Sequence, residues 1–192
     1  MTNPASLSSR RNALRTISAA AAASPVLAPA GLAAGVEPDI WAARYKLSKN
    51  YTLKIAEAMP AEKYGYRPTG ETSGDGARSF GEVVQHIASA EIHYVGRFGK
   101  GPAPAAPKDA AGKPDVSKPT TIKFLTDTFD WAIGIVGALN PSDITNAVPP
   151  GRPDGTGLDR LLDAMIHTAH TRGYADMYLR NNGIKPPSYN VG

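Results

Sequence analysis

The feature that most constrains the fold of this chain is a set of four apolar repeats with helical spacing. Apolar residues recur every three or four positions in residues 38–59, 80–98, 120–139 and 158–181. No alternating, strand-like run exceeds three or four residues, and the chain has no internal repeat. The pattern predicts an all-α protein, a four-helix bundle built from these four segments.

Proline and glycine mark where the expected helices begin and end. Pro38 suits a first helical position and Pro60 ends the first segment, while Ser79 and Glu82 have the spacing of a capping box before the second. Segments 61–77, 99–119 and 143–157 are rich in proline, glycine or both and have no apolar face. We therefore expect long loops between helices 1 and 2, 2 and 3, and 3 and 4, with Asn140 and Pro141 ending helix 3.

The amino-acid composition limits the core and the chemistry. Aromatic residues make up only 7% of the chain, so alanine and branched aliphatic side chains must fill the core, which suits closely packed helices. The chain has no cysteine, which excludes disulfides, cysteine nucleophiles and thiolate metal sites. Any metal ion must therefore be held by histidine, aspartate or glutamate.

Residues 1–33 have the pattern of an export signal. The stretch SRRNALR at residues 9–15 resembles the twin-arginine pattern S-R-R-x-F-L-K, and an alanine-rich, acid-free segment follows it. That segment is too weakly apolar for a stable membrane anchor, and small residues near Ala30 and Ala33 suit a signal peptidase. We predict a twin-arginine-type signal peptide at 1–33, a periplasmic or otherwise exported protein, and a helical domain at 37–187. A disordered alanine-rich tail is the alternative.

The positive charge of the chain belongs mainly to this leader. The chain has 21 lysines and arginines against 17 acids, and residues 1–33 contain three arginines and no acid. The rest therefore has 18 basic and 17 acidic residues. A nearly neutral domain without a basic patch offers no electrostatic basis for binding nucleic acid.

The four histidines all fall in the expected helices, and three of them are candidate metal ligands. His86 lies near the apolar stripe of helix 2, and His167 lies near the apolar stripe of helix 4. His170 follows His167 by three positions, so both rings can face one point. Three neutral imidazoles with an open fourth position are typical of a catalytic zinc site. Each histidine has an alternative as a hydrogen-bonded core residue, and His93 is expected to be structural or to lie at the rim.

Four stretches carry a resemblance to a known family. They are PAEKYGYRP at 60–68, RSFGEVVQHIA at 78–88, HTAHTRG at 167–173 and YLRNNGIKPP at 178–187. Their order and spacing resemble the DinB-like (DinB/YfiT-type) family, metal-binding four-helix bundles grouped with bacillithiol and mycothiol transferases. The resemblance spans nearly all of the chain after the leader and implies the same fold.

The resemblance also implies a ligand set, and this chain departs from it at one position. Family members typically place two ligands four residues apart in helix 4, and aligning Arg172 and Gly173 puts the second ligand at Thr171. His86 and His167 match family ligands, whereas a threonine hydroxyl is a poor ligand for zinc or nickel. We expect His86, His167 and His170 to hold a divalent ion, Zn²⁺ or Ni²⁺, with His170 reaching it only if helix 4 rotates or the ion shifts.

Two function classes remain open at this stage. The first is a metal-dependent hydrolase or transferase acting on a small molecule; export argues against thiol transfer, because those thiols are cytoplasmic. The second is a noncatalytic binding or stress-associated helical domain with a degenerate metal site, which Thr171 favours. Asp163, Glu91 and Asp130 are weaker candidates near the site. The sequence does not specify the oligomeric state and is compatible with a homodimer.

Overall fold

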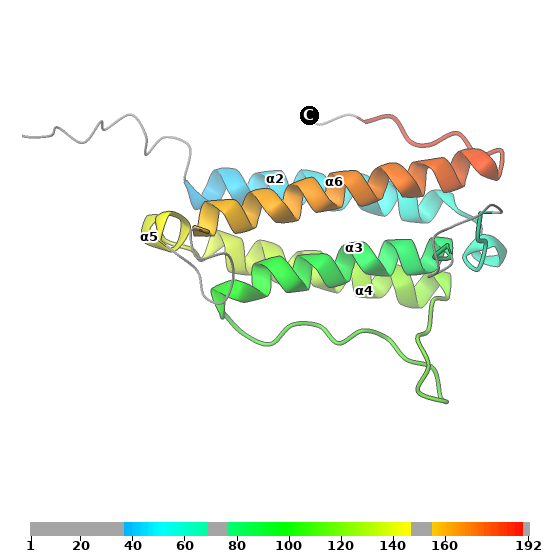
Figure 1. The fold of residues 1–192 in the computed structure, drawn as a ribbon, viewed down its shortest axis with the longest axis horizontal. Coiled ribbons are helices and arrows are strands. Elements are labelled where there is room, and N and C mark those ends of the chain that lie inside the picture. The colour runs from blue at the N-terminus through cyan, green and yellow to red at the C-terminus, as the bar shows by residue number, and fades with distance from the viewer. Residues whose placement is uncertain (1–36, 69–76, 147–154, 190–192) are drawn as a thin grey trace, which may run out of the picture. The chain divides into compact units, whose positions relative to one another are not determined.

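Four long helices make up the fold, and Figure 1 shows them running side by side. The structure is a computed structural model that describes residues 37–68, 77–146 and 155–189. The described residues contain no strand, and an isolated bridge joins Lys108 to Pro114. The all-α, four-helix-bundle prediction is confirmed, while the predicted signal peptide lies outside the described residues. The elements are α2 (Pro38–Ala58), η2 (Ala61–Lys63), α3 (Phe80–Val95), η3 (Gly96–Phe98), α4 (Lys118–Gly137), α5 (Pro141–Thr145) and α6 (Gly157–Asn181).

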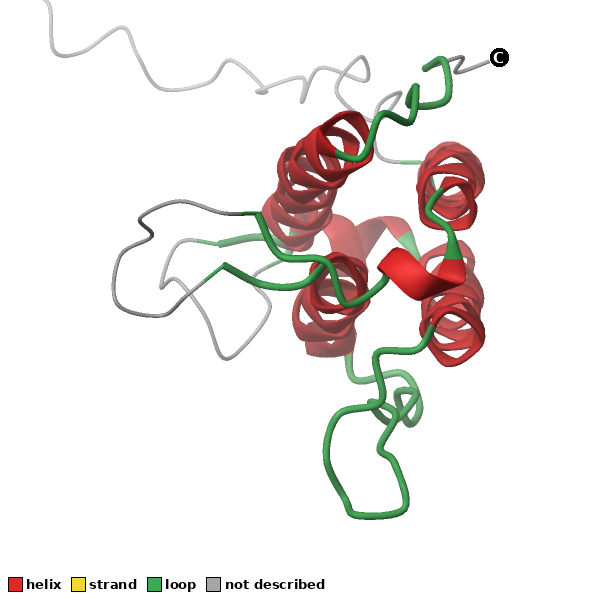
Figure 2. Cartoon of the chain, turned by 90° about the vertical axis from the view of Figure 1, so that its right-hand side faces the viewer, coloured by secondary structure: helices red, strands yellow, loops and turns green. Residues whose placement is uncertain are grey.

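The helices enclose one apolar core. α3 packs against both α4 and α6, and α2 packs against α4, whereas α2 and α6 make fewer contacts with each other. Figure 2 shows the long helices end-on around this interior. No helix among the described residues is long and apolar enough to cross a membrane. The largest fully buried apolar side chains are Tyr45, Tyr64, Phe80, Phe129, Ile55, Met59, Ile87, Leu125, Ile144, Leu161 and Leu179.

The capping chemistry in the sequence sets most helix boundaries. Ser79 and Glu82 form the expected capping box at the start of α3, and α6 begins with a second capping box at Thr156. α3 passes directly into η3, so the helical segment ends at Phe98 as expected. α4 begins at Lys118, two residues earlier than the expected Thr120. Pro119 falls in the first turn, where a missing backbone N–H costs nothing.

The segment after α4 is not wholly a loop, and this part of the prediction is wrong. α4 ends at Gly137, two residues before the expected Leu139, and Asn140 and Pro141 begin the short helix α5. The Asn140 side chain accepts a hydrogen bond from the backbone N–H of Asp143, and the Asp143 carboxylate accepts one from the backbone N–H of Asn140. α5 then packs against α6 and buries Ile144 in the core.

Two buried polar contacts join α3 to its neighbours. The Gln85 side chain donates to Thr121 Oγ1 of α4 over 2.9 Å. Thr168 Oγ1 of α6 donates to Glu91 Oε1 over 2.5 Å, and the Glu91 side chain is fully buried. Burial raises the pKa of Glu91 to about 7, although the Thr168 hydrogen bond acts in the opposite direction. These bonds restrict how α4 and α6 can slide or turn against α3.

The start of α6 depends on a glycine. A Cβ atom at Gly157 would lie 2.1 Å from the backbone oxygen of Asp143, whereas a Cβ at Gly173 meets nothing within 4 Å. We predict that Gly157→Ala destabilises the protein by about 1–3 kcal/mol through overpacking. Gly173→Ala in the same helix should stabilise it by up to about 1 kcal/mol through helix propensity. Urea unfolding of both variants measures the difference, and a Gly157→Ala protein at least as stable as the parent would contradict the packing argument.

Candidate functional site

Two histidines from different helices lie together on one side of the bundle. The rings of His86 in α3 and His167 in α6 have centroids 4.9 Å apart, with planes at 72°. Both residues are half-buried. The structure therefore brings together the two histidines that match family ligand positions.

A pocket opens beside this pair. It has a volume of about 240 Å³ and is lined mainly by one face of α3, with His167 contributed by α6. The ring of Tyr94 lies 6.0 Å from that of His167. His93, expected at the rim, is exposed and lines the same pocket. The lining residues are His86, Ser89, Ala90, His93, Tyr94 and His167.

The surroundings of both rings favour the neutral imidazole over the charged form. Burial lowers the pKa of His86, and the positive charge of Arg78 and the neighbouring His167 lower it further. Burial also lowers the pKa of His167, and the charges of His170, Arg78 and His93 lower it further. His167 Nδ1 is buried and has no hydrogen-bond partner among the described residues. A neutral imidazole keeps one nitrogen lone pair free, which is what a metal ion or a proton donor requires.

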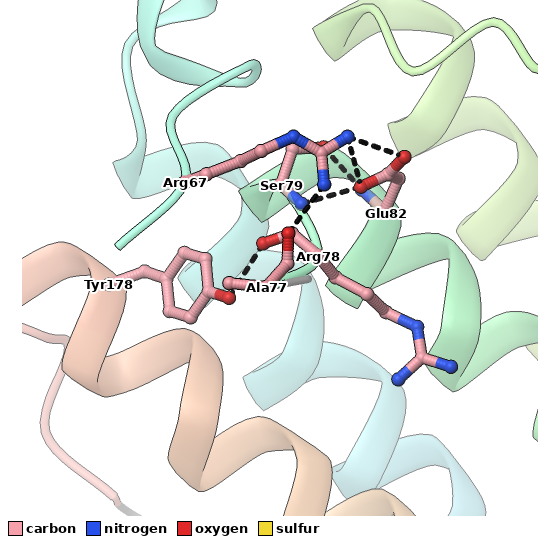
Figure 3. A network of polar contacts seen from close by, with 6 residues as sticks. All are labelled: Arg67, Ala77, Arg78, Ser79, Glu82 and Tyr178. Carbon is pink, nitrogen blue, oxygen red and sulfur yellow. Dashed lines mark hydrogen bonds and ion pairs between the residues drawn. The ribbon is translucent and has the colours of Figure 1, made fainter. Parts of the chain in front are cut away.

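Arg78 lies in a framework of hydrogen bonds at the start of α3, which Figure 3 shows. Tyr178 Oη in α6 donates to the backbone oxygen of Arg78 over 2.7 Å, and Arg67 forms an ion pair with Glu82 over 2.8 Å. The Arg78 guanidinium extends away from this framework, with no bond drawn to it. Arg78 is not among the residues expected from the sequence. Its one signal there is its position directly before the N-cap Ser79, about two turns ahead of His86.

His170 is not next to the other two histidines. Its side chain is exposed, and its ring lies 4.9 Å from that of Tyr174. Thr171, where the resemblance places a ligand, is buried with 5% exposure. Across the described ranges 37–68, 77–146 and 155–189, no three His, Cys, Asp or Glu side chains are grouped to hold a metal ion. The three-histidine site remains a prediction that requires a change in this arrangement.

The acidic candidates lie elsewhere. Glu91 is in the bundle interior, bonded to Thr168, and Asp130 pairs with Lys49. Asp163 lies 3.7 Å from Arg160. The described contacts of these three acids do not include a bond to His86 or His167.

Comparisons with known proteins give one family match and a matching fold. The family model of the DinB superfamily matches residues 44–174. Among solved structures, the chain is similar to YjoA, a DinB-like protein from Bacillus subtilis, with 18% identity and a TM-score of 0.61. That match covers 79% of this chain and 98% of YjoA. A search of curated proteins gave no match.

The charge of Arg78 provides a test of the site's electrostatics. Because this charge opposes protonation of both rings, Arg78→Gln should raise the pKa of His86 and of His167. NMR titration of the histidine ring protons measures both values. Arg180→Gln is the matched control, since the charge of Arg180 does not act on either ring. Unchanged histidine pKa values in Arg78→Gln would show that Arg78 lies too far away to matter.

Proposed function

The chain belongs to the DinB superfamily, and on that premise we propose that its His86–His167 pair binds a divalent metal ion, Zn²⁺ or Ni²⁺. The observation that carries this proposal is the 4.9 Å approach of two rings from helices distant in sequence. Imidazole nitrogen is a preferred ligand of both ions.

The ionisation and surroundings of the pair fit such an ion. Metal binding requires deprotonated imidazoles, and the lowered pKa of both rings reduces the competition with protons. The unpartnered Nδ1 of His167 supplies a buried lone pair. Two protein ligands leave positions for water and for a small molecule in the adjoining pocket.

The activity that we propose for the loaded site is hydrolysis or group transfer on a small molecule. The ion, when bound, supplies Lewis acidity. Ser89 and Tyr94 line the pocket and offer hydroxyl groups that can orient a ligand. Arg78 adds positive charge near both histidines, which favours an anionic or polarised substrate.

His170 has a conditional role in this proposal. It becomes a third ligand only if α6 turns about its axis or the ion shifts toward it. The buried Thr168–Glu91 hydrogen bond opposes such a turn of α6. The fixed part of the site is therefore His86 and His167.

The alternative function is a noncatalytic binding domain with a degenerate site. The observation that favours it is Thr171, a buried hydroxyl at the position where the family resemblance implies a histidine. Such a domain retains the bundle and its pocket but binds a metal ion weakly or not at all.

Isothermal titration with Zn²⁺ and Ni²⁺ distinguishes the two functions. We predict that His86→Ala and His167→Ala each weaken binding by about tenfold or more, because each removes one of two fixed ligands. Thr171→His should strengthen binding, since it restores a ligand one turn after His167. His170→Ala should have a smaller effect than either alanine variant of the pair.

His93→Ala is the matched control, because it removes a histidine from the same pocket and leaves both proposed ligands in place. Absence of binding by the parent protein at micromolar metal, combined with binding by Thr171→His, would establish the degenerate-site alternative. Equal affinity of the parent, His86→Ala and His167→Ala would reject this location for the metal.

We also propose that the protein is exported through the twin-arginine route and cleaved between about residues 30 and 36. The support is the arginine pair at Arg10 and Arg11 followed by an acid-free, alanine-rich segment. We predict that replacing both arginines by lysine retains the uncut 20.2 kDa chain in the cytoplasm. Intact-mass measurement of fractionated cells tests this, and an uncut parent chain found only in the cytoplasm would contradict export.

A further inference from the structure

A second polar site lies on the opposite side of α6 from the histidine pair, and it is built around a buried arginine. The Arg172 side chain is only 8% exposed and is directed toward α2. Its Nη1 donates to Ser48 Oγ over 3.1 Å and to Thr52 Oγ1 over 3.3 Å. The guanidinium carbon lies 5.0 Å from the centre of the Tyr51 ring and 6.0 Å from that of Tyr189.

The charge of Arg172 is not balanced by an ion pair. No carboxylate among the described residues lies within 4.0 Å of it. Two acids act on its charge. Glu91 accepts a hydrogen bond from Thr168, and Asp176 is half-buried, which raises the pKa of its carboxyl group. Burial lowers the pKa of Arg172 even though both acids oppose this shift. A buried cation is costly unless a negative group faces it, so this environment lacks part of its counter-charge.

The hydrogen-bonding capacity of the guanidinium is also only partly used. Every hydrogen bond from the Arg172 side chain to the described residues is donated by Nη1. Nε and Nη2 donate to no described residue. These two nitrogens form the edge of a guanidinium that binds a carboxylate through two parallel hydrogen bonds.

A small pocket adjoins this side chain. Its volume is about 60 Å³, and its lining combines two arginines with apolar groups. Arg44 is exposed and has no ion pair among the described residues, so it brings a second positive charge. A single water needs about 10–15 Å³ of such a volume. The pocket therefore accommodates a group of a few heavy atoms. The lining residues are Arg44, Leu47, Ser48, Met165, Arg172 and Tyr189.

We propose that this pocket binds a small monocarboxylate, with its carboxylate held by Arg172 and Arg44 and its short apolar part against Leu47 and Met165. A single negative charge suits the site better than a dianion such as phosphate, because Glu91 and Asp176 lie near the guanidinium. No residue of this lining also lines the pocket beside His86 and His167. The site is therefore independent of the proposed metal site.

NMR titration of the full chain with sodium acetate tests the proposal, with sodium chloride at equal ionic strength as the reference. The signal followed is the side-chain Nε–H of Arg172, assigned through its backbone. We expect a saturable shift with acetate, a several-fold weaker response with phosphate, and binding by His86→Ala equal to that of the parent.

Variants of the rim separate this site from general charge effects. Arg44→Ala should weaken acetate binding several-fold. Lys46→Ala should leave it unchanged, because Lys46 carries the same charge on α2 but points about 200° away around the helix. A shift that does not saturate, an equal shift with chloride, or equal acetate binding by Arg44→Ala and the parent would overturn the proposal. These measurements use the folded parent and surface variants, so they do not depend on whether replacing Arg172 unfolds the protein.

Discussion

The buried hydrogen bond from Thr168 to Glu91 is the contact on which the candidate site depends. It joins two residues 77 positions apart and fixes the rotation of α6 against α3. Successive residues of a helix are about 100° apart, so with Thr168 turned inward, His167 lies at the edge of the α3–α6 interface, where it meets His86. His170 is about 200° from Thr168 and therefore faces solvent. One interior contact thus decides which histidines meet.

α6 presents different chemistry to its two neighbours. Toward α3, this helix places the half-buried His167 beside His86. Toward α2, it places the buried cation Arg172. The interior between these sites is polar: the Glu91 carboxylate and the Tyr45 hydroxyl are both fully buried, and burial together with the neighbouring Glu91 raises the pKa of Tyr45. Buried polar groups of this kind cost stability. The looser approach of α2 to α6 leaves room for the pocket beside Arg172.

Much of the fold could be predicted because its determinants are local. Pro38 and the Ser79–Glu82 capping box mark helix starts in the sequence and do so in the structure. α5 was missed because Asn140 and Pro141 were interpreted only as the end of a helix, although the same pair caps the next one. Glu91 occupies a position of the apolar stripe, four residues after Ile87, which was a signal for burial. The position of His170 could not be predicted, because it follows from a contact between distant helices and not from spacing within one.

The central claim is that the bundle brings two neutral imidazoles together as ligands of one ion. Anomalous diffraction at the nickel absorption edge, from crystals of the protein grown with Ni²⁺, tests it most directly. We expect a single strong peak bonded to one ring nitrogen of His86 and one of His167, at about 2.1 Å from each. A peak at His93 or His170 alone, or no peak in the pocket of a nickel-saturated crystal, would contradict it.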